Sequence, residues 1–205
     1  MQETLNHIND LKEIRSMMEK SSRFISLSGL SGIFAGIFAL LGAATAYWYL
    51  DLNLTSPSDY KLNPEEYYLF FFLDAFIVLS LAICSGIFFT IRQSKKKNQK
   101  IWDKTSYRLV INVLIPLAVG GFFCLGLLYH QLPGLIAPAT LLFYGLALLN
   151  GSKYTLDDVR YLGYTQIGLG LVATFLPGHG LLFWAIGFGI MHIVYGTLMY
   201  FKYEK

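Results

Sequence analysis

The tripeptide Leu132-Pro133-Gly134 lies near the middle of residues 109–152, a stretch without Lys, Arg, Asp or Glu. A second tripeptide, Leu176-Pro177-Gly178, lies in another uncharged stretch, residues 161–201. Each stretch is about twice as long as the ~20 residues that cross a bilayer. A helix does not continue easily through Pro-Gly. Each stretch therefore predicts two membrane helices joined by a tight turn.

The rest of the chain fits the same class. Only 14% of the 205 residues are charged, whereas soluble domains contain about 25%. Two further apolar spans run from Phe24 to about Leu50 and from about Tyr67 to Ile91. Together with spans at about 107–129, 132–149, 156–176 and 180–201, they predict an all-α polytopic membrane protein. We expect six transmembrane helices in residues 24–205, arranged as three in-out-in hairpins.

Residues 1–23 are polar, and their apolar side chains recur every three or four positions. This spacing predicts a short amphipathic helix. It would lie on the membrane surface or under the bundle, or it would be a solvated lead-in helix. The segment does not read as a secretory signal, because the first apolar run begins too far into the chain and is too long.

The basic residues predict the orientation. Fifteen of the 16 Lys and Arg lie in the N-terminal segment, in residues 92–108 and 150–160, and at the C-terminal end. With six spans these four segments share one side, whereas Lys61 lies on the other. Because cytoplasmic loops carry the excess of Lys and Arg, both termini are predicted to be cytoplasmic. The basic loop 92–108 could bind anionic lipid, a cytosolic partner or nucleic acid, but this topology alone accounts for it, and we expect no nucleic-acid partner.

Small residues in the first span form a possible helix-packing seam. Ser28, Gly32 and Gly36 recur at steps of four, a spacing that lets two helix backbones approach closely. The seam would hold this helix within the bundle or build a homo-oligomer.

Asp74 is the only Asp, Glu, Lys or Arg deep in a predicted span. His130 and His179 are predicted at the same outer side of the membrane. If the three side chains converged, they would form a proton-responsive or metal-binding site. The simpler interpretation is three separate interfacial polar residues, and the sequence predicts no metal.

Three further polar residues lie within the later spans. His192, near the middle of the sixth span, could ligate a haem or contact a lipid or quinone. No other span supplies a second histidine at matching depth, so we expect a hydrogen bond to a neighbouring helix and no cofactor. Asn112 and Gln166 are both placed towards the cytoplasmic side, where they could pair with each other or each form a hydrogen bond with another neighbouring helix.

The last two predicted hairpins contain an internal match. Leu125-Gly-Leu-Leu128 precedes the first Leu-Pro-Gly, and Leu169-Gly-Leu-Val172 precedes the second at an offset of 44 residues. The match indicates either a parallel repeat with its axis along the membrane normal or a coincidence of common residues.

Several segments resemble a known family: residues 21–32, 153–163, 180–189 and 195–203. The family is one of small bacterial polytopic integral membrane proteins with no established activity. The resemblance implies a multi-pass protein of the bacterial inner membrane, and it transfers no functional residue.

The sequence leaves two function classes open. We find no catalytic motif and no acid–base constellation, so we expect no enzyme. The first class is a non-enzymatic membrane module, as a sensor, scaffold or accessory subunit, that binds a cytosolic or membrane protein partner. The second is a small-solute or ion transporter that uses the intramembrane polar residues.

Overall fold

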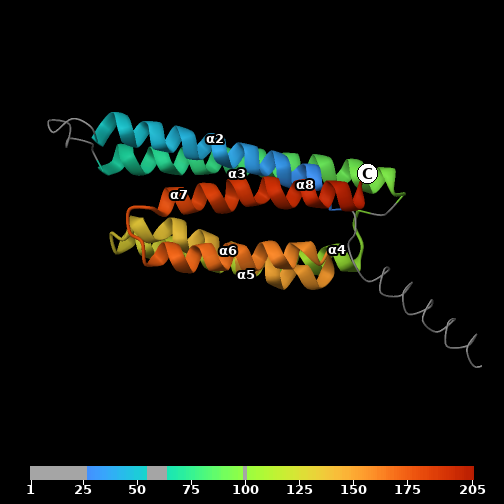
Figure 1. Ribbon diagram of the computed structural model, residues 1–205. Coiled ribbons are helices and arrows are strands. Elements are labelled where there is room, and N and C mark those ends of the chain that lie inside the picture. The colour runs from blue at the N-terminus through green and yellow to red at the C-terminus, as the bar shows by residue number, and fades with distance from the viewer. Residues whose placement is uncertain (1–26, 55–63, 99–100) are drawn as a thin grey trace, which may run out of the picture.

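A computed structural model describes residues 27–54, 64–98 and 101–205, and the regular structure in these ranges is helical throughout (Figure 1). The predicted all-α class is confirmed. The predicted amphipathic helix at 1–23 lies outside the described residues. The elements are α2 (Gly29–Leu54), α3 (Pro64–Lys96), α4 (Lys104–Tyr129), η1 (Pro133–Leu135), α5 (Ile136–Gly151), η2 (Ser152–Tyr154), α6 (Asp158–Thr174), α7 (Gly180–Trp184), η3 (Ala185–Met191) and α8 (His192–Tyr203). Of these, α7, η3 and α8 follow without a break and form one rod, the C-terminal rod.

Five of these helical segments are long and apolar enough to cross a membrane: α2, α3, α4, α5 with its flanking turns, and the C-terminal rod. The sixth segment, α6, has 17 residues. At 1.5 Å per residue it is about 26 Å long, slightly less than the ~30 Å hydrocarbon core of a bilayer.

The two turns predicted at Leu-Pro-Gly are confirmed. Helix α4 ends at Tyr129, and Pro133 begins the short turn η1. Likewise, α6 ends at Thr174 and the C-terminal rod begins at Gly180. Gly178, between them, has a φ of +89°, a conformation that side chains with a Cβ rarely adopt. Proline therefore interrupts each long apolar stretch, and glycine closes the second turn.

The helices form a bundle with α3 and α4 at its margins (Figure 1). Helix α3 packs on α2, and α2 also packs on the C-terminal rod. That rod contacts α5 and α6, which pack along each other, and α4 packs on α5. Among described residues, Lys and Arg occur at or next to the helix ends that meet at one end of this bundle, where α2 begins and α8 ends. We call it the basic end.

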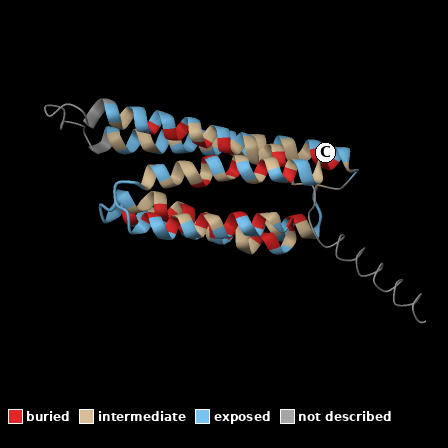
Figure 2. Cartoon of the chain, in the orientation of Figure 1, coloured by how far each residue is buried: buried red, intermediate tan, exposed pale blue. Residues whose placement is uncertain are grey.

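Buried residues follow the surfaces where these helices meet (Figure 2). The side chains of Leu141 on α5 and Gln166 on α6 are completely buried. In the most apolar part of α2, 33% of the residues are buried, whereas the buried share is 6% in the corresponding part of α3 and 6% in that of α4. The outer two helices therefore offer most of their apolar surface to the surroundings.

The seam of small residues on α2 lies inside the chain. Gly32 faces Gly196 of α8, and a Cβ added at Gly32 would lie 3.1 Å from the Gly196 Cα. A Cβ added at Gly36 would lie 2.6 Å from the Gly189 carbonyl oxygen. Ser28, at the same spacing, is buried beside the end of α8. These residues let α2 and the C-terminal rod approach backbone to backbone.

The two hairpins that contain the internal match pack differently. Helix α4 packs along α5, whereas α6 meets the C-terminal rod only sparsely and packs along α5 instead. The packing therefore gives the repeat no support, and it stays a prediction.

Candidate functional site

The most unusual backbone of the bundle is the π-helix η3, seven residues long, in the C-terminal rod. A π-helix bonds each carbonyl five residues ahead, and such segments are frequent at functional sites. Two glycines in η3 make room for neighbouring helices. A Cβ at Gly187 would lie 2.6 Å from the Gln166 Oε1 atom, and Gly189 is covered by Leu40 of α2.

Four residues converge at this π-helix, and we call them the His192 cluster: Tyr144, Gln166, Gly187 and His192. The Gly187 carbonyl oxygen accepts a hydrogen bond from Gln166 Nε2 at 2.7 Å and lies 3.0 Å from His192 Nδ1. The other ring nitrogen, Nε2, lies 2.8 Å from the Tyr144 hydroxyl. The cluster therefore ties α5, α6 and the C-terminal rod together.

The hydrogen bonds define the tautomer of His192. A carbonyl oxygen only accepts, so Nδ1 must carry the proton that it donates to Gly187. In the neutral ring, Nε2 then accepts from the Tyr144 hydroxyl. Both ring nitrogens are engaged, which leaves no free lone pair for a metal or haem iron. This arrangement matches the predicted role of His192 as a hydrogen-bonding residue between helices.

The cluster is closed off from the surroundings. His192 is 7% exposed and Gln166 is completely buried. The ring of Phe188 stacks on the imidazole with centroids 5.9 Å apart. Within the described part of the chain, the buried Gln166 Oε1 atom has no hydrogen-bond partner. The Gln166 Oε1 atom is therefore a buried acceptor without a hydrogen bond in the middle of the bundle.

The predicted pairing of Asn112 with Gln166 is wrong. The Asn112 side chain donates to the Arg108 carbonyl oxygen at 2.8 Å, one turn earlier on α4. Its own backbone carbonyl accepts from the Asn150 side chain at 2.9 Å. The physical reason is the arrangement of the bundle: α4 packs on α5, so Asn112 faces α5, whereas Gln166 faces the C-terminal rod.

The outer residues do not converge either. Asp74 Oδ1 accepts a hydrogen bond from the Thr45 hydroxyl of α2 at 2.7 Å. His130 directly follows the last residue of α4 and His179 directly precedes α7, and both are exposed. Neither histidine is hydrogen-bonded to Asp74, because α3 packs on α2, away from the turns that carry the histidines. The three residues are therefore separate, and within the described ranges no group of three His, Cys, Asp or Glu could hold a metal ion.

Two hydroxyl partners, those of Tyr144 and Thr45, were not predicted from the sequence. Tyr144 lies in the middle of its span, far from the interfaces where membrane tyrosines usually lie, and that position was a usable signal. Thr45 gave a weaker one, since it also bonds the Gly42 carbonyl of its own helix at 2.8 Å, as threonines in membrane helices often do.

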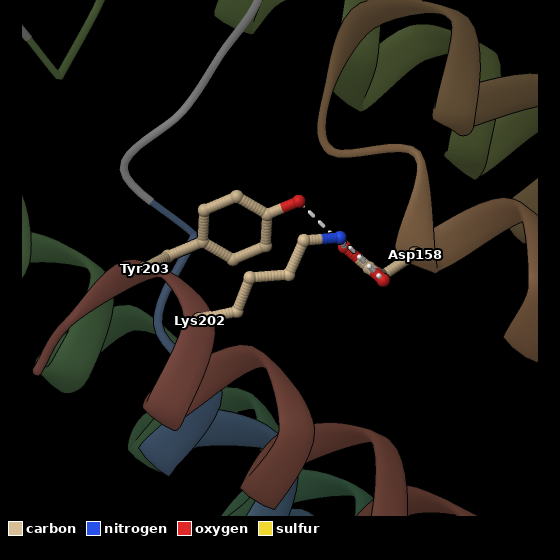
Figure 3. A network of polar contacts seen from close by, with 3 residues as sticks. All are labelled: Asp158, Lys202 and Tyr203. Atoms are coloured by element: carbon tan, nitrogen blue, oxygen red, sulfur yellow. Dashed lines mark hydrogen bonds and ion pairs between the residues drawn. The ribbon is translucent and has the colours of Figure 1, made fainter.

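Two charged contacts join helices at the basic end. Figure 3 shows Lys202 and Tyr203 of α8 reaching Asp158, the first residue of α6. The Lys202 Nζ atom lies 3.0 and 3.1 Å from the two carboxylate oxygens, and the Tyr203 hydroxyl donates to one of them at 2.6 Å. Next to them, the Glu204 carboxylate accepts from the Ser28 hydroxyl and from the Gly29 N–H, at the start of α2.

Comparisons of the chain with family models, with curated proteins and with solved structures found no match.

Proposed function

We propose that this chain is a non-enzymatic integral membrane protein that binds another protein, as a sensor, scaffold or accessory subunit. The observation that supports this function best is the use of the intramembrane polar groups. His192, Gln166 and Asp74 bond other helices of the same chain. The interior therefore has the character of a packed scaffold.

The margin of the bundle offers the surface for such a partner. Helix α3 packs on α2 and turns a row of large apolar side chains outward, among them Phe72, Phe76 and Phe88. Because lipid covers an apolar face as well as a protein does, the partner must be tested directly. Photoreactive amino acids at Phe72 and Phe76 should give protein adducts in native membranes. The same substitution at Phe122 on α4 is the matched control, and lipid adducts alone at all three positions would refute the proposal.

We also propose six crossings of a bacterial inner membrane, with both termini and the basic end in the cytoplasm. The starts of α2 and α6 both lie beside the end of α8, as the contacts of Ser28 with Glu204 and of Asp158 with Lys202 show. Helices α2 and α6 therefore run in one direction and α8 runs in the opposite direction. All ten Lys and Arg in the described ranges lie at the basic end, and cytoplasmic loops carry this excess.

The test of this topology uses cysteines at exposed positions of a variant without native cysteines. Cysteines replacing His130 and His179 should react with an impermeant thiol reagent from the periplasmic side. Cysteines replacing Asn98 and Lys153 should react only after the membrane is opened. Reaction of Asn98→Cys in intact cells would invert the proposed orientation.

A second function, transport of an ion or small solute, is supported by the π-helix at the His192 cluster and its unpaired Gln166 Oε1 atom. Irregular backbone and ionisable groups at the midplane are features of transport sites. Proteoliposomes with an internal pH dye would report proton flux, and His192→Phe should abolish it. Equal flux with the parent protein, the variant and empty vesicles would exclude this proton pathway.

A further inference from the structure

We propose that the basic end holds a binding site for the phosphate headgroup of a phospholipid. A cavity of about 260 Å³ lies there between the start of α2, the last turns of α3 and the end of α8. It is far larger than the roughly 30 Å³ that one water molecule occupies in the liquid. The described residues that line it are Ser28, Leu30, Phe89, Arg92, Gln93, Lys96, Tyr200 and Glu204.

The charges in this cavity do not cancel. Arg92 and Lys96, one turn apart on α3, lie on the same face of the helix. Neither forms an ion pair with another described residue. The carboxylate of Glu204 is turned to the Ser28 hydroxyl and the Gly29 N–H. Two cations and one carboxylate leave one positive charge, which one phosphodiester would neutralise.

Gln93 provides an independent sign of a ligand. Its side chain lines the cavity and is 5% exposed. No hydrogen bond joins its amide group to another described residue, and the amide atoms are not among the closed-off polar atoms, so they are open to the cavity. A phosphate oxygen held between Arg92 and Lys96 would accept a hydrogen bond from the Gln93 amide. The two cations and this donor could therefore bind the same anion.

The walls of the cavity favour a lipid over free phosphate. One turn before Arg92, Phe89 stacks on Phe34 of α2, with ring centroids 4.9 Å apart. Leu30 of α2 completes this apolar side. Moving along α3 away from Phe89, the lining thus changes from apolar to cationic, and α3 carries exposed apolar residues, Ile87 and Phe88, beside it. An amphipathic molecule fits this gradient, and basic pockets between helices on the cytoplasmic side are known sites for anionic headgroups.

Native mass spectrometry of the delipidated full-length protein tests the site. Three probes separate the chemistry: phosphatidylglycerol, a diacylglycerol with the same acyl chains but no phosphate, and glycerol phosphate without chains. Phosphatidylglycerol should bind much more tightly than either of the others. Equal binding of diacylglycerol would reduce the site to an apolar groove, and equal binding of glycerol phosphate would exclude a lipid as its specific ligand.

The decisive variant is Arg92→Gln with Lys96→Gln. At about 1 kcal/mol for each cation near an anionic headgroup, it should weaken phosphatidylglycerol binding about 30-fold. The matched control is Lys104→Gln with Arg108→Gln, which removes two exposed cations at the same spacing from α4, outside the cavity. The control should bind like the parent, and equal weakening in both would overturn the proposal.

A single substitution keeps the test valid if the double variant does not fold. Gln93→Glu preserves size but places a carboxylate in the proposed phosphate position, so it should abolish specific binding while Gln93→Met should weaken it only modestly. Unchanged binding by Gln93→Glu would refute the site. The two proposals share Phe88 at their margin but are tested at different residues, Phe72 and Phe76 for the protein partner and Arg92, Gln93 and Lys96 for the lipid. The failure of one proposal therefore leaves the other standing.

Discussion

Helices α2 and α3 pack against each other and are both strongly apolar, yet they differ in what else they contact. Helix α2 lies between α3 and the C-terminal rod, and 33% of its most apolar part is buried. Helix α3 contacts mainly α2, and the corresponding share is 6%. In a bilayer, apolar character does not draw a residue inside, because lipid is equally apolar. The difference in burial follows residue size. On the side away from α3, helix α2 presents Gly32 and Gly36, which let the C-terminal rod approach closely. On the side away from α2, helix α3 presents exposed phenylalanines such as Phe72 and Phe76.

The largest expected effect comes from filling the α2 seam. Gly36→Leu would place its Cβ 2.6 Å from the Gly189 carbonyl and 3.0 Å from the Ile193 nitrogen, both backbone atoms. We expect a loss of about 3 kcal/mol or more in the free energy of unfolding, since backbone cannot yield as side chains do. Gly86→Leu on α3, where a Cβ meets nothing within 4 Å, is the control and should be tolerated. Unfolding in mixed micelles with increasing dodecyl sulfate measures both, and equal losses would erase the difference between the two helices.

The next prediction compares a core position with an outer one. Leu141 of α5 is completely buried, whereas Phe76 of α3 is 60% exposed. Leu141→Ala should cost about 3 kcal/mol by leaving a cavity. Phe76→Ala should change the stability of the isolated protein by less than about 0.5 kcal/mol. A large loss of unfolding free energy for Phe76→Ala in purified protein would mean that another protein molecule, such as a second copy, covers the outer face of α3 in detergent.

A smaller effect is expected at the His192 cluster. Tyr144→Phe removes the hydroxyl that bonds His192 Nε2 at 2.8 Å and leaves that nitrogen buried without a partner. The expected loss in unfolding free energy is between about 1 and 2 kcal/mol. Tyr161→Phe on the exposed side of α6 should have almost no effect. If both variants have the same unfolding free energy as the parent, a water molecule must replace the Tyr144 hydroxyl, and the cluster is not dry.

Much of the fold could be predicted from the sequence, because its signals are local. The positions of Pro133 and Pro177 indicated where helices must stop, and the uncharged runs indicated their lengths. The packing of α2 was also partly predictable, since Ser28, Gly32 and Gly36 share one face. The sequence could not indicate which helix meets that face, because glycines that allow close approach occur in several spans, and Gly196 carries no mark that distinguishes it from Gly126.

The candidate site was less predictable for a related reason. Depth along a helix follows from counting residues, but the direction in which a side chain faces depends on the neighbours. Asn112 and Gln166 have compatible depths, yet they lie on helices that do not pack on each other. His192 was correctly expected to bond a neighbouring helix, whereas its partners Tyr144 and Gly187 depend on the π-helix. The i→i+5 bonding of the π-helix changes the helical spacing of side chains in that segment, and no local sequence pattern gave its position.

The smallest effect concerns the start of the outer helix α4. Asp103 caps this helix, since its Oδ1 atom accepts from the Ser106 N–H at 2.7 Å and from the Ser106 hydroxyl at 2.8 Å. The backbone hydrogen bond from Ser106 is the main reason that the pKa of Asp103 lies below its usual value. A carboxyl group whose pKa is lowered by folding stabilises the fold above its unfolded pKa, about 3.9 for Asp. That contribution is lost as the pH falls through the folded pKa.

Two substitutions at Asp103 separate the cap from its charge. Asp103→Ala should lower the unfolding free energy at pH 7 by about 0.5 kcal/mol, the lower end for helix caps, because the site is exposed. Asp103→Asn keeps an acceptor for the Ser106 N–H and should stay close to the parent at pH 7, but it has no carboxyl group to titrate. Thermal unfolding in detergent between pH 7 and about pH 3 should therefore show a larger loss for the parent than for either variant near the acid end. An identical acid-induced loss in all three proteins would show that Asp103 does not contribute to the pH dependence, and that the margin of the bundle at α4 is held by its contacts with α5 alone.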